Sequence, residues 1–515
     1  MKLRLTILTT SPKNFPSAQS GQNKSVLTFL VFTLSTVLCS PSFAAEKSVS
    51  EPPALSQSKP NVLFIAVDDL RCEFGAYGAH YIHAPNLDRL AQRGVTFKRA
   101  YCQQAVCMGS RASLLTGARP DTTKVYDGNT TFRDAMPDVV TLPQLFKNHG
   151  WFVQGMGKVF HAEADPVSTS VPWTKPKINH GAYGRPEHTA MVVRKGQNNG
   201  KMERGPAFES SDVPDNTFHD GQLADMAVVA LRECAKKERP FWLGVGFIRP
   251  HLPFVSPKKY WDLYDPAKIA LAPNPFPPQG GPDYAVSSGG ELRSYGGVPS
   301  ERGIPDDFAR QLRHGYYAAI SYMDAQLGRV LDELDRLGLR ENTIIVLWGD
   351  HGWKLGEHGA WAKHTNVEND THAPLLIAVP GMKTAGRHTD ALVEFVDIYP
   401  TLAELCGLPL PPHLEGASFA PVLADPQRRG KSAAFSQYPR SSGGTALMGY
   451  TMRTDRYRLT RWVHRDDHAK VDAVELYDDQ ADPQENVNIA SDPKNKVLVA
   501  TLTAQWITGT RGAPK

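Results

Sequence analysis

The stretch Asn61-Val-Leu-Phe-Ile-Ala-Val67, followed directly by Asp68-Asp69, gives the strongest indication of the fold. Its seven residues are almost entirely apolar and rich in branched side chains, which is typical of a parallel strand buried on both faces. Similar short apolar runs occur farther along the chain, at 153–156, 240–247, 343–348 and 374–379. We expect each of them to be a buried strand of one sheet.

Helical patterns separate these runs. Residues 85–93, 141–149 and 220–237 each favour a helix, the first two with Gly directly after them. Between 306 and 338, apolar residues recur at steps of three and four, which predicts one long amphipathic helix. The alternation predicts an α/β fold: a mostly parallel central sheet sandwiched by helices.

The pattern changes after about residue 430. Short strand-like pieces at 434–438, 447–453 and 456–462 predict a smaller C-terminal subdomain built on a short antiparallel sheet. We therefore expect a main domain over 59–430 and a C-terminal subdomain over 431–515. Within the main domain, 253–305 is rich in Pro, Gly and Ser and reads as a long loop, which in compact domains is usually functional or mobile.

The amino terminus has the composition of a secretory signal peptide, which we place at 1–45. Four basic residues and no acidic ones accompany the apolar run 25–39, and Ser42-Phe43-Ala44 provides small residues for cleavage. We expect an exported protein, periplasmic or extracellular, with no stable membrane insertion after cleavage. The formal charge of +4 comes entirely from this segment, so the mature chain is neutral and we expect no nucleic acid partner.

Two predicted strands end in side chains that could bind a metal ion, Asp68-Asp69 and Asp350-His351. Ligands of open α/β sheets bind beyond the carboxyl ends of the strands. Three carboxylates meeting there would repel one another without a cation, and oxygen ligands favour Ca²⁺ or Mg²⁺. By themselves the two pairs could equally cap turns, and the residues alone leave both interpretations open.

Cys107-Met-Gly-Ser-Arg111, followed by a Leu-Thr-Gly tail, resembles the sulfatase signature Cys-x-Pro-x-Arg. Other blocks resemble sulfatase motifs in the same order along the chain: 59–69, 157–161, 250–254, 350–363 and 475–486. The chain is therefore identified as similar to the formylglycine-dependent sulfatases of the alkaline-phosphatase-like superfamily, and most similar to their iduronate-2-sulfatase branch. The resemblance makes 59–430 a catalytic domain and the chain a sulfuric ester hydrolase.

The resemblance also implies a mechanism. A maturation enzyme oxidises Cys107 to formylglycine, whose hydrate attacks the sulfur of a sulfated carbohydrate. The implied substrate is 2-O-sulfated iduronate or a related uronate in glycosaminoglycan or other polysaccharide fragments. One Ca²⁺ ion would be held by five residues: Asp68, Asp69, Cys107, Asp350 and His351.

The remaining roles also follow from the resemblance. Arg111 would steady the hydrate, Lys158 and Lys363 would bind sulfate oxygens, and His161 would take the proton of the second hydroxyl. His251 would protonate the leaving sugar oxygen. A lone Lys or His is usually a surface or structural residue, so the surrounding blocks carry these assignments.

Two residues depart from the common sulfatase pattern. Gly109 stands where the family has Pro or, less often, Ala, and the added chain entropy costs the maturation enzyme about 1 kcal/mol of binding. His351 stands where most sulfatases have Asn, and imidazole is a poor partner for Ca²⁺. The iduronate branch also has His at this place, so His351 favours that branch.

Several alternatives stay open at this point. The chain could be a phosphodiesterase or phosphonate hydrolase of the same superfamily, although Lys158 and Lys363 favour sulfate. It could also bind sulfated glycans without hydrolysing them, if Cys107 is not matured. Glu357 and His358 could contact the sugar or serve the fold. Three further histidines match no block and are expected to be structural: His314, His372 and His413.

Overall fold

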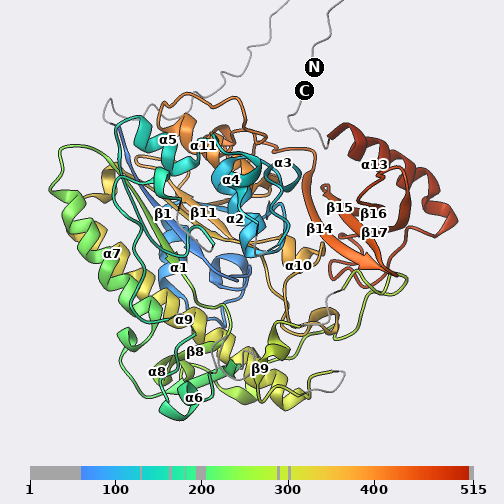
Figure 1. The fold of residues 1–515 in the computed structure, drawn as a ribbon, viewed down its shortest axis with the longest axis horizontal. Helices are drawn as coiled ribbons and strands as arrows, with labels where there is room; N and C mark the ends of the chain where they lie inside the picture. The colour runs from blue at the N-terminus through green and yellow to red at the C-terminus, as the bar shows by residue number, and fades with distance from the viewer. Residues whose placement is uncertain are drawn as a thin grey trace, which may run out of the picture. The chain divides into compact units, whose positions relative to one another are not determined.

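Seven strands form the central sheet of the computed structural model (Figure 1), which describes residues 59–127, 130–161, 165–179, 181–192, 204–286, 290–299 and 303–509. The signal peptide expected at 1–45 lies outside the described residues. Within those residues, no helix combines the length and apolarity that a membrane span requires. The strands lie in the order β12 (Arg387–Thr389), β2 (Val95–Phe97), β11 (Leu375–Ala378), β10 (Thr343–Gly349), β1 (Asn61–Val67), β7 (Phe241–Phe247) and β4 (Phe152–Gly157).

The sheet is mostly parallel, as the sequence predicts. β1 lies between β10 and β7 and pairs in parallel with both, and β4 extends the parallel set beyond β7. β11 alone runs against its neighbours β10 and β2. The chain between β10 and β11 contains only a single turn at Glu357–Gly359 and the short helix α10 (Glu368–Thr371), so it stays at the carboxyl edge and β11 runs back from there.

Helices cover both faces of the sheet, as the packing around β1 shows. Its side chains alternate between the faces, as they do in any strand. Leu63, Ile65 and Val67 pack with α1 (Pro85–Arg93), α7 (His219–Ala235) and α9 (Asp306–Arg336). Val62, Phe64 and Ala66 pack with α2 (Cys107–Thr116), α5 (Leu142–Asn148) and α11 (Ile398–Leu405). Burial on both faces explains the continuous apolar run.

A second, four-stranded antiparallel sheet lies near the C-terminus (Figure 1). Its strands follow one another in space as in the sequence: β14 (Ala434–Ser442), β15 (Thr445–Arg453), β16 (Tyr457–His464) and β17 (Val471–Asp478). Helix α13 (Lys496–Gly509) packs on this sheet through Leu502 and Trp506. Arg440 of β14 donates a hydrogen bond to the carbonyl of His364, which ties the sheet to the 350–363 block.

The long segment 253–305 is a loop region that contains only short elements. Among its described residues they are β8 (Phe254–Pro257), α8 (Lys258–Trp261), single turns at Pro266–Lys268 and Leu292–Ser294, and β9 (Tyr295–Gly296). Other small elements of the fold are β3 (Ala100–Tyr101), β5 (Arg204–Pro206), β6 (Phe208–Ser211), β13 (Val393–Glu394), α3 (Pro120–Thr123), α4 (Phe132–Ala135), α6 (Pro186–Ala190) and α12 (Ala420–Ala424).

Candidate active site

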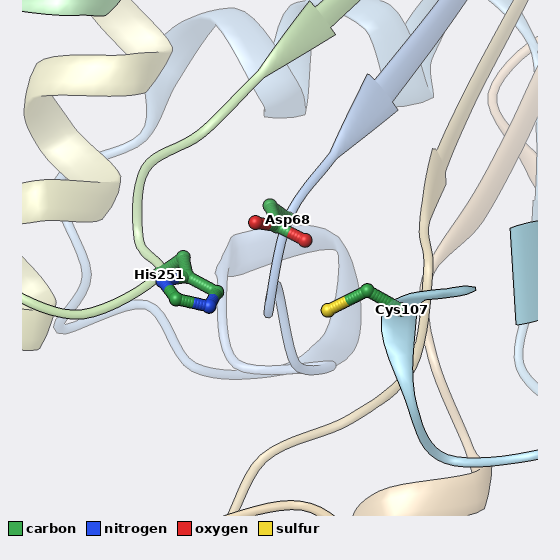
Figure 2. A group of neighbouring side chains, drawn as sticks. All are labelled: Asp68, Cys107 and His251. Carbon is green, nitrogen blue, oxygen red and sulfur yellow. The ribbon is translucent and has the colours of Figure 1, made fainter. Parts of the chain in front are cut away.

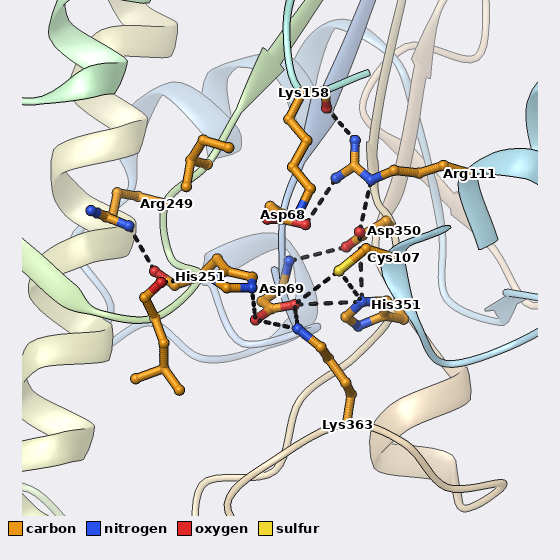
Figure 3. A network of polar contacts seen from close by, with 12 residues as sticks. Asp68, Asp69, Cys107, Arg111, Lys158, Arg249, His251, Asp350, His351 and Lys363 are labelled. Carbon is orange, nitrogen blue, oxygen red and sulfur yellow. Dashed lines mark hydrogen bonds and ion pairs between the residues drawn. The ribbon is translucent and has the colours of Figure 1, made fainter. Parts of the chain in front are cut away.

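Four adjacent parallel strands deliver side chains to one edge of the sheet. The chain leaves β1, β10, β7 and β4 at their carboxyl ends, where the site of an open α/β sheet is expected. The residues that directly follow these ends are Asp68 and Asp69, Asp350 and His351, Arg249 to His251, and Lys158. Figure 3 shows the side chains of Asp68, Asp69, Asp350, His351, His251 and Lys158 converging, whereas Arg249 points away and donates to the carbonyl of His251.

Three carboxylates lie at the centre of the site. Asp68, Asp69 and Asp350 are fully buried, and each offers an oxygen to a group whose atoms lie within 4.8 Å of one another. The backbone amide of Asp69 donates to Asp350 Oδ1 at 3.0 Å. Asp69 has a φ of 60°, a strained conformation for a residue other than glycine. Such strain is common at functional sites.

Basic side chains compensate these carboxylates (Figure 3). Arg111 donates from Nη2 to Asp68 at 3.1 Å and from Nε to Asp350 at 2.9 Å. Lys158 Nζ lies 2.5 Å from Asp68, and Lys363 Nζ lies 2.8 Å from Asp69. Burial by itself would raise the pKa of Asp68, but Lys158 and His251 hold this pKa well below its ordinary value. Asp68 is therefore ionised at neutral pH.

Cys107 is the first residue of α2, and its side chain is 3% exposed. Its Sγ lies 3.2 Å from His351 Nε2 and 4.0 Å from Asp69 Oδ1. His351 Nδ1 donates to the carbonyl of Gly352 at 2.9 Å, so Nε2 presents its lone pair to the site. Burial raises the pKa of the Cys107 thiol well above its ordinary value.

Arg111 lies one helical turn after Cys107, as the sequence predicts for residues four apart. Its described hydrogen bonds, however, go to Asp68, Asp350 and two backbone carbonyls, and none goes to Cys107. The arginine therefore holds the carboxylates in place around Cys107.

His251 faces Cys107 from the opposite side of Asp68 (Figure 2). Atoms of these three side chains lie within 4.8 Å of one another. His251 Nδ1 donates to the carbonyl of Leu252 at 2.6 Å, so its Nε2 is directed into the site. A group bound between them could be attacked from the Cys107 side and protonated from the His251 side.

The sequence analysis also singled out His161, Glu357 and His358. Burial and the charge of Lys158 lower the pKa of His161 to about 3, and its buried Nδ1 has no hydrogen-bond partner among the described residues. Glu357 is buried, accepts from Arg71 at 3.1 Å and serves the fold. His358 is buried with a φ of 54°, and neither ring nitrogen is hydrogen-bonded within the described residues.

The histidines expected to be structural lie as predicted. His314 and His413 bind the backbone carbonyls of Trp261 and Thr116 at 2.9 and 3.0 Å. His372 lies 3.5 Å from the sulfur of Cys72. None of the three belongs to the network of Figure 3.

Glu291 joins the site although no motif contains it. Its Oε1 lies 3.2 Å from His251 Nε2, and its Oε2 lies 3.2 Å from Lys363 Nζ. It belongs to the 253–305 loop, so the length of that loop was the one signal in the sequence that pointed to it.

The chain is similar to known proteins along most of its length. The sulfatase family model matches residues 60–408, and a model of the C-terminal region of N-sulphoglucosamine sulphohydrolase matches 356–511. Iduronate 2-sulfatase of Mus musculus is 36% identical over 515 aligned residues, which cover 86% of this chain and 93% of that protein.

Solved structures share the fold. A protein in complex with its substrate D-glucosamine-2-N,6-O-disulfate is 21% identical, with a TM-score of 0.66 over 89% of this chain and 100% of that one. Phosphonate monoester hydrolase of Silicibacter pomeroyi is 24% identical, with a TM-score of 0.69 over 88% and 95%. At these identities, the two structures establish the fold alone. The match of the family model and the identity to iduronate 2-sulfatase go further, and together they show that this chain belongs to the sulfatase family and is a sulfuric ester hydrolase.

Proposed function

We propose that this protein is an exported sulfatase that hydrolyses sulfate esters of sulfated sugars, with 2-O-sulfated iduronate or a related uronate as the preferred unit. The observation that carries the proposal is the placement of Cys107 and His251 on opposite sides of Asp68, beside Lys158 and Lys363. The identity to the mouse iduronate 2-sulfatase supports the choice of sugar.

Residue 107 is the nucleophile in this proposal, after oxidation to formylglycine by a maturation enzyme. A formylglycine hydrate supplies one hydroxyl for attack on sulfur and a second whose deprotonation releases sulfate. The burial of Cys107 inside the first turn of α2 supports oxidation before folding, since the folded chain gives another enzyme little access to it.

The donor set of the site fits a hard divalent cation. Three buried carboxylates and a His nitrogen with a free lone pair are the ligands, and we assign one Ca²⁺ to Asp68, Asp69, Asp350, His351 and residue 107. When bound, the cation polarises the sulfate and lowers the pKa of the nucleophile. The rest of the chemistry belongs to side chains of the chain itself.

Lys158 and Lys363 bind the sulfate oxygens, and their pairing with Asp68 and Asp69 fixes the positions of both ammonium groups. Arg111 holds the carboxylates of Asp68 and Asp350 in place through an ion pair with each. His251 protonates the leaving sugar oxygen from Nε2, since Nδ1 is held by Leu252. In this proposal His161 accepts the proton of the second hydroxyl; burial and Lys158 lower its pKa, which keeps it neutral and also makes it a weak base.

The proposal extends to the organisation of the chain. Residues 1–45 are the signal peptide, 59–430 the catalytic domain and 431–515 the C-terminal subdomain. The hydrogen bond from Arg440 to the residue after Lys363 supports a role of that subdomain in shaping the site.

A substrate panel tests the function. Protein purified from its own host, or from a host with a maturation enzyme, is given a 2-O-sulfated uronide, a 6-O-sulfated glucosamine, an aryl sulfate and a phosphonate monoester. We expect the highest kcat/KM for sulfate release from the uronide, loss of turnover in Cys107→Ala, and reversible loss when Ca²⁺ is chelated. Faster hydrolysis of the phosphonate ester than of every sulfate would contradict the proposal.

A further inference from the structure

Glu291 contacts Lys363 and His251, which in the proposed function bind the sulfate and protonate the leaving sugar oxygen. Its carboxylate lies 3.2 Å from His251 Nε2 and 3.2 Å from Lys363 Nζ, and its side chain is 16% exposed. It directly precedes the turn Leu292–Ser294, within the long loop that follows β8. No sulfatase block of the sequence includes it, so its place in the site follows from the folded chain alone.

Glu291 can accept hydrogen bonds that the protein does not provide. Lys363 and His251 outweigh the effect of burial and hold the pKa of Glu291 well below its ordinary value. The ionised carboxylate is an acceptor only. Lys363 Nζ donates a hydrogen bond to Oε1 at 3.5 Å, whereas Oε2, which lies 3.2 Å from the same Nζ, is buried and has no hydrogen-bond partner among the described residues. A donor from outside the chain would satisfy this oxygen.

The carboxylate lies on the leaving-group side of the site. Glu291 shares a group of atoms within 4.8 Å with Asp69 and His251, whereas the groups that contain Cys107 do not include it. In the proposed function Cys107 and His251 lie on opposite sides of Asp68, and Glu291, 3.2 Å from His251 Nε2, lies on the His251 side. The part of a substrate that reaches Glu291 is the sugar next to the ester oxygen.

We infer that Glu291 is a specificity-determining residue, which selects sulfated sugars that carry a free hydroxyl on the carbon next to the ester. This inference rests on the proposed function. A hydroxyl donates to the carboxylate, whereas a second sulfate or a carboxylate at that place meets a like charge in a partly buried site. A buried group left unpaired by the wrong substrate is a strong basis for discrimination. For a 2-O-sulfated uronate, the hydroxyl is the one on carbon 3.

The test combines a change in the protein with a change in the substrate. We measure kcat/KM of wild type and Glu291→Ala for methyl 2-O-sulfo-iduronoside, its 3-deoxy analogue and 4-methylumbelliferyl sulfate. We expect wild type to prefer the hydroxylated sugar over the deoxy sugar by about tenfold to a hundredfold, as for a hydrogen bond to a charged group. In Glu291→Ala the preference falls below about threefold, as a pairwise coupling requires.

The aryl sulfate gives a readout of opposite sign. It offers no hydroxyl, and removal of Glu291 frees Lys363 for the sulfate, so its kcat/KM rises several-fold. Asp283→Asn, an exposed charge on the same loop, is the control and retains the wild-type preference. A preference that persists in Glu291→Ala, or an equal loss on all three substrates, overturns the inference while the sulfatase function stands. Failure of wild type to release sulfate from either sugar overturns both.

Discussion

Removal of Arg111 is the most informative perturbation of the charge balance. Arg111 is 1% exposed and joins Asp68 and Asp350, both fully buried, at 3.1 and 2.9 Å. Arg111→Met keeps most of the side-chain volume but leaves two buried carboxylates without their shared cation. Breaking a buried ion pair in this way costs about 3–5 kcal/mol of the free energy of unfolding.

Calcium should reduce that cost if the carboxylates are its ligands. In Arg111→Met, Asp350 loses its arginine partner and Asp68 keeps only Lys158, so the carboxylates attract the ion more strongly than in wild type. Each tenfold gain in affinity returns about 1.4 kcal/mol at saturating ion. The assay is urea unfolding of both proteins in chelator and in millimolar Ca²⁺. We expect a penalty of about 4 kcal/mol in chelator that falls by at least ~1.4 kcal/mol in Ca²⁺.

Arg119→Met is the matched control. Arg119 makes a bidentate ion pair with buried Glu394, at 2.7 and 2.8 Å. This pair does not involve Asp68, Asp69 or Asp350. Its loss should also destabilise the protein, but Ca²⁺ should not restore stability. A penalty for Arg111→Met that is the same with and without Ca²⁺, or equal restoration of both variants, would refute the reasoning.

Three further outcomes are expected. Gly109→Ala places a Cβ 3.0 Å from Gln104 Oε1 and 3.2 Å from a backbone oxygen, so urea unfolding should show a loss of about 1–3 kcal/mol; unchanged stability would contradict this packing. Arg71 and Arg313 outweigh burial and lower the pKa of Glu357 to about 2. The free energy of unfolding of wild type should therefore exceed that of Glu357→Gln by about 3 kcal/mol at pH 7. This difference is present above pH 4.5 and is lost as the pH falls towards 2. A constant difference from pH 7 to 2.5 would argue against this ion pair. His251→Ala should lower kcat/KM about a hundredfold for a sugar sulfate and less than tenfold for an activated aryl sulfate, and equal losses would exclude a general acid.

The sequence predicted the parts of the fold that bury many apolar residues. β1, β7 and β10 are continuous apolar runs because helices cover both faces of the sheet, and α9 appears as a clear period of three and four residues. Very short strands carry no such pattern. β2 and β12 have three residues each, too few for a periodicity, and their place follows from pairing with distant segments.

The site shows the same division between local pattern and tertiary contact. The resemblance to sulfatase motifs pointed to Asp68, Cys107 and Lys363, which the fold brings together from distant segments. The partners of Arg111 could not be read from its position four residues after Cys107, because they come from two different strands. Glu291 lies in a loop without regular structure, so only the folded chain reveals its contacts.

The most direct test of the account is the mass of the tryptic peptide 100–111, measured on native-host protein alongside its sulfate release. We predict an aldehyde at residue 107, with turnover proportional to the fraction of protein that carries it. An unmodified thiol in protein that still releases sulfate would contradict the central claim, because residue 107 would then not be the formylglycine nucleophile.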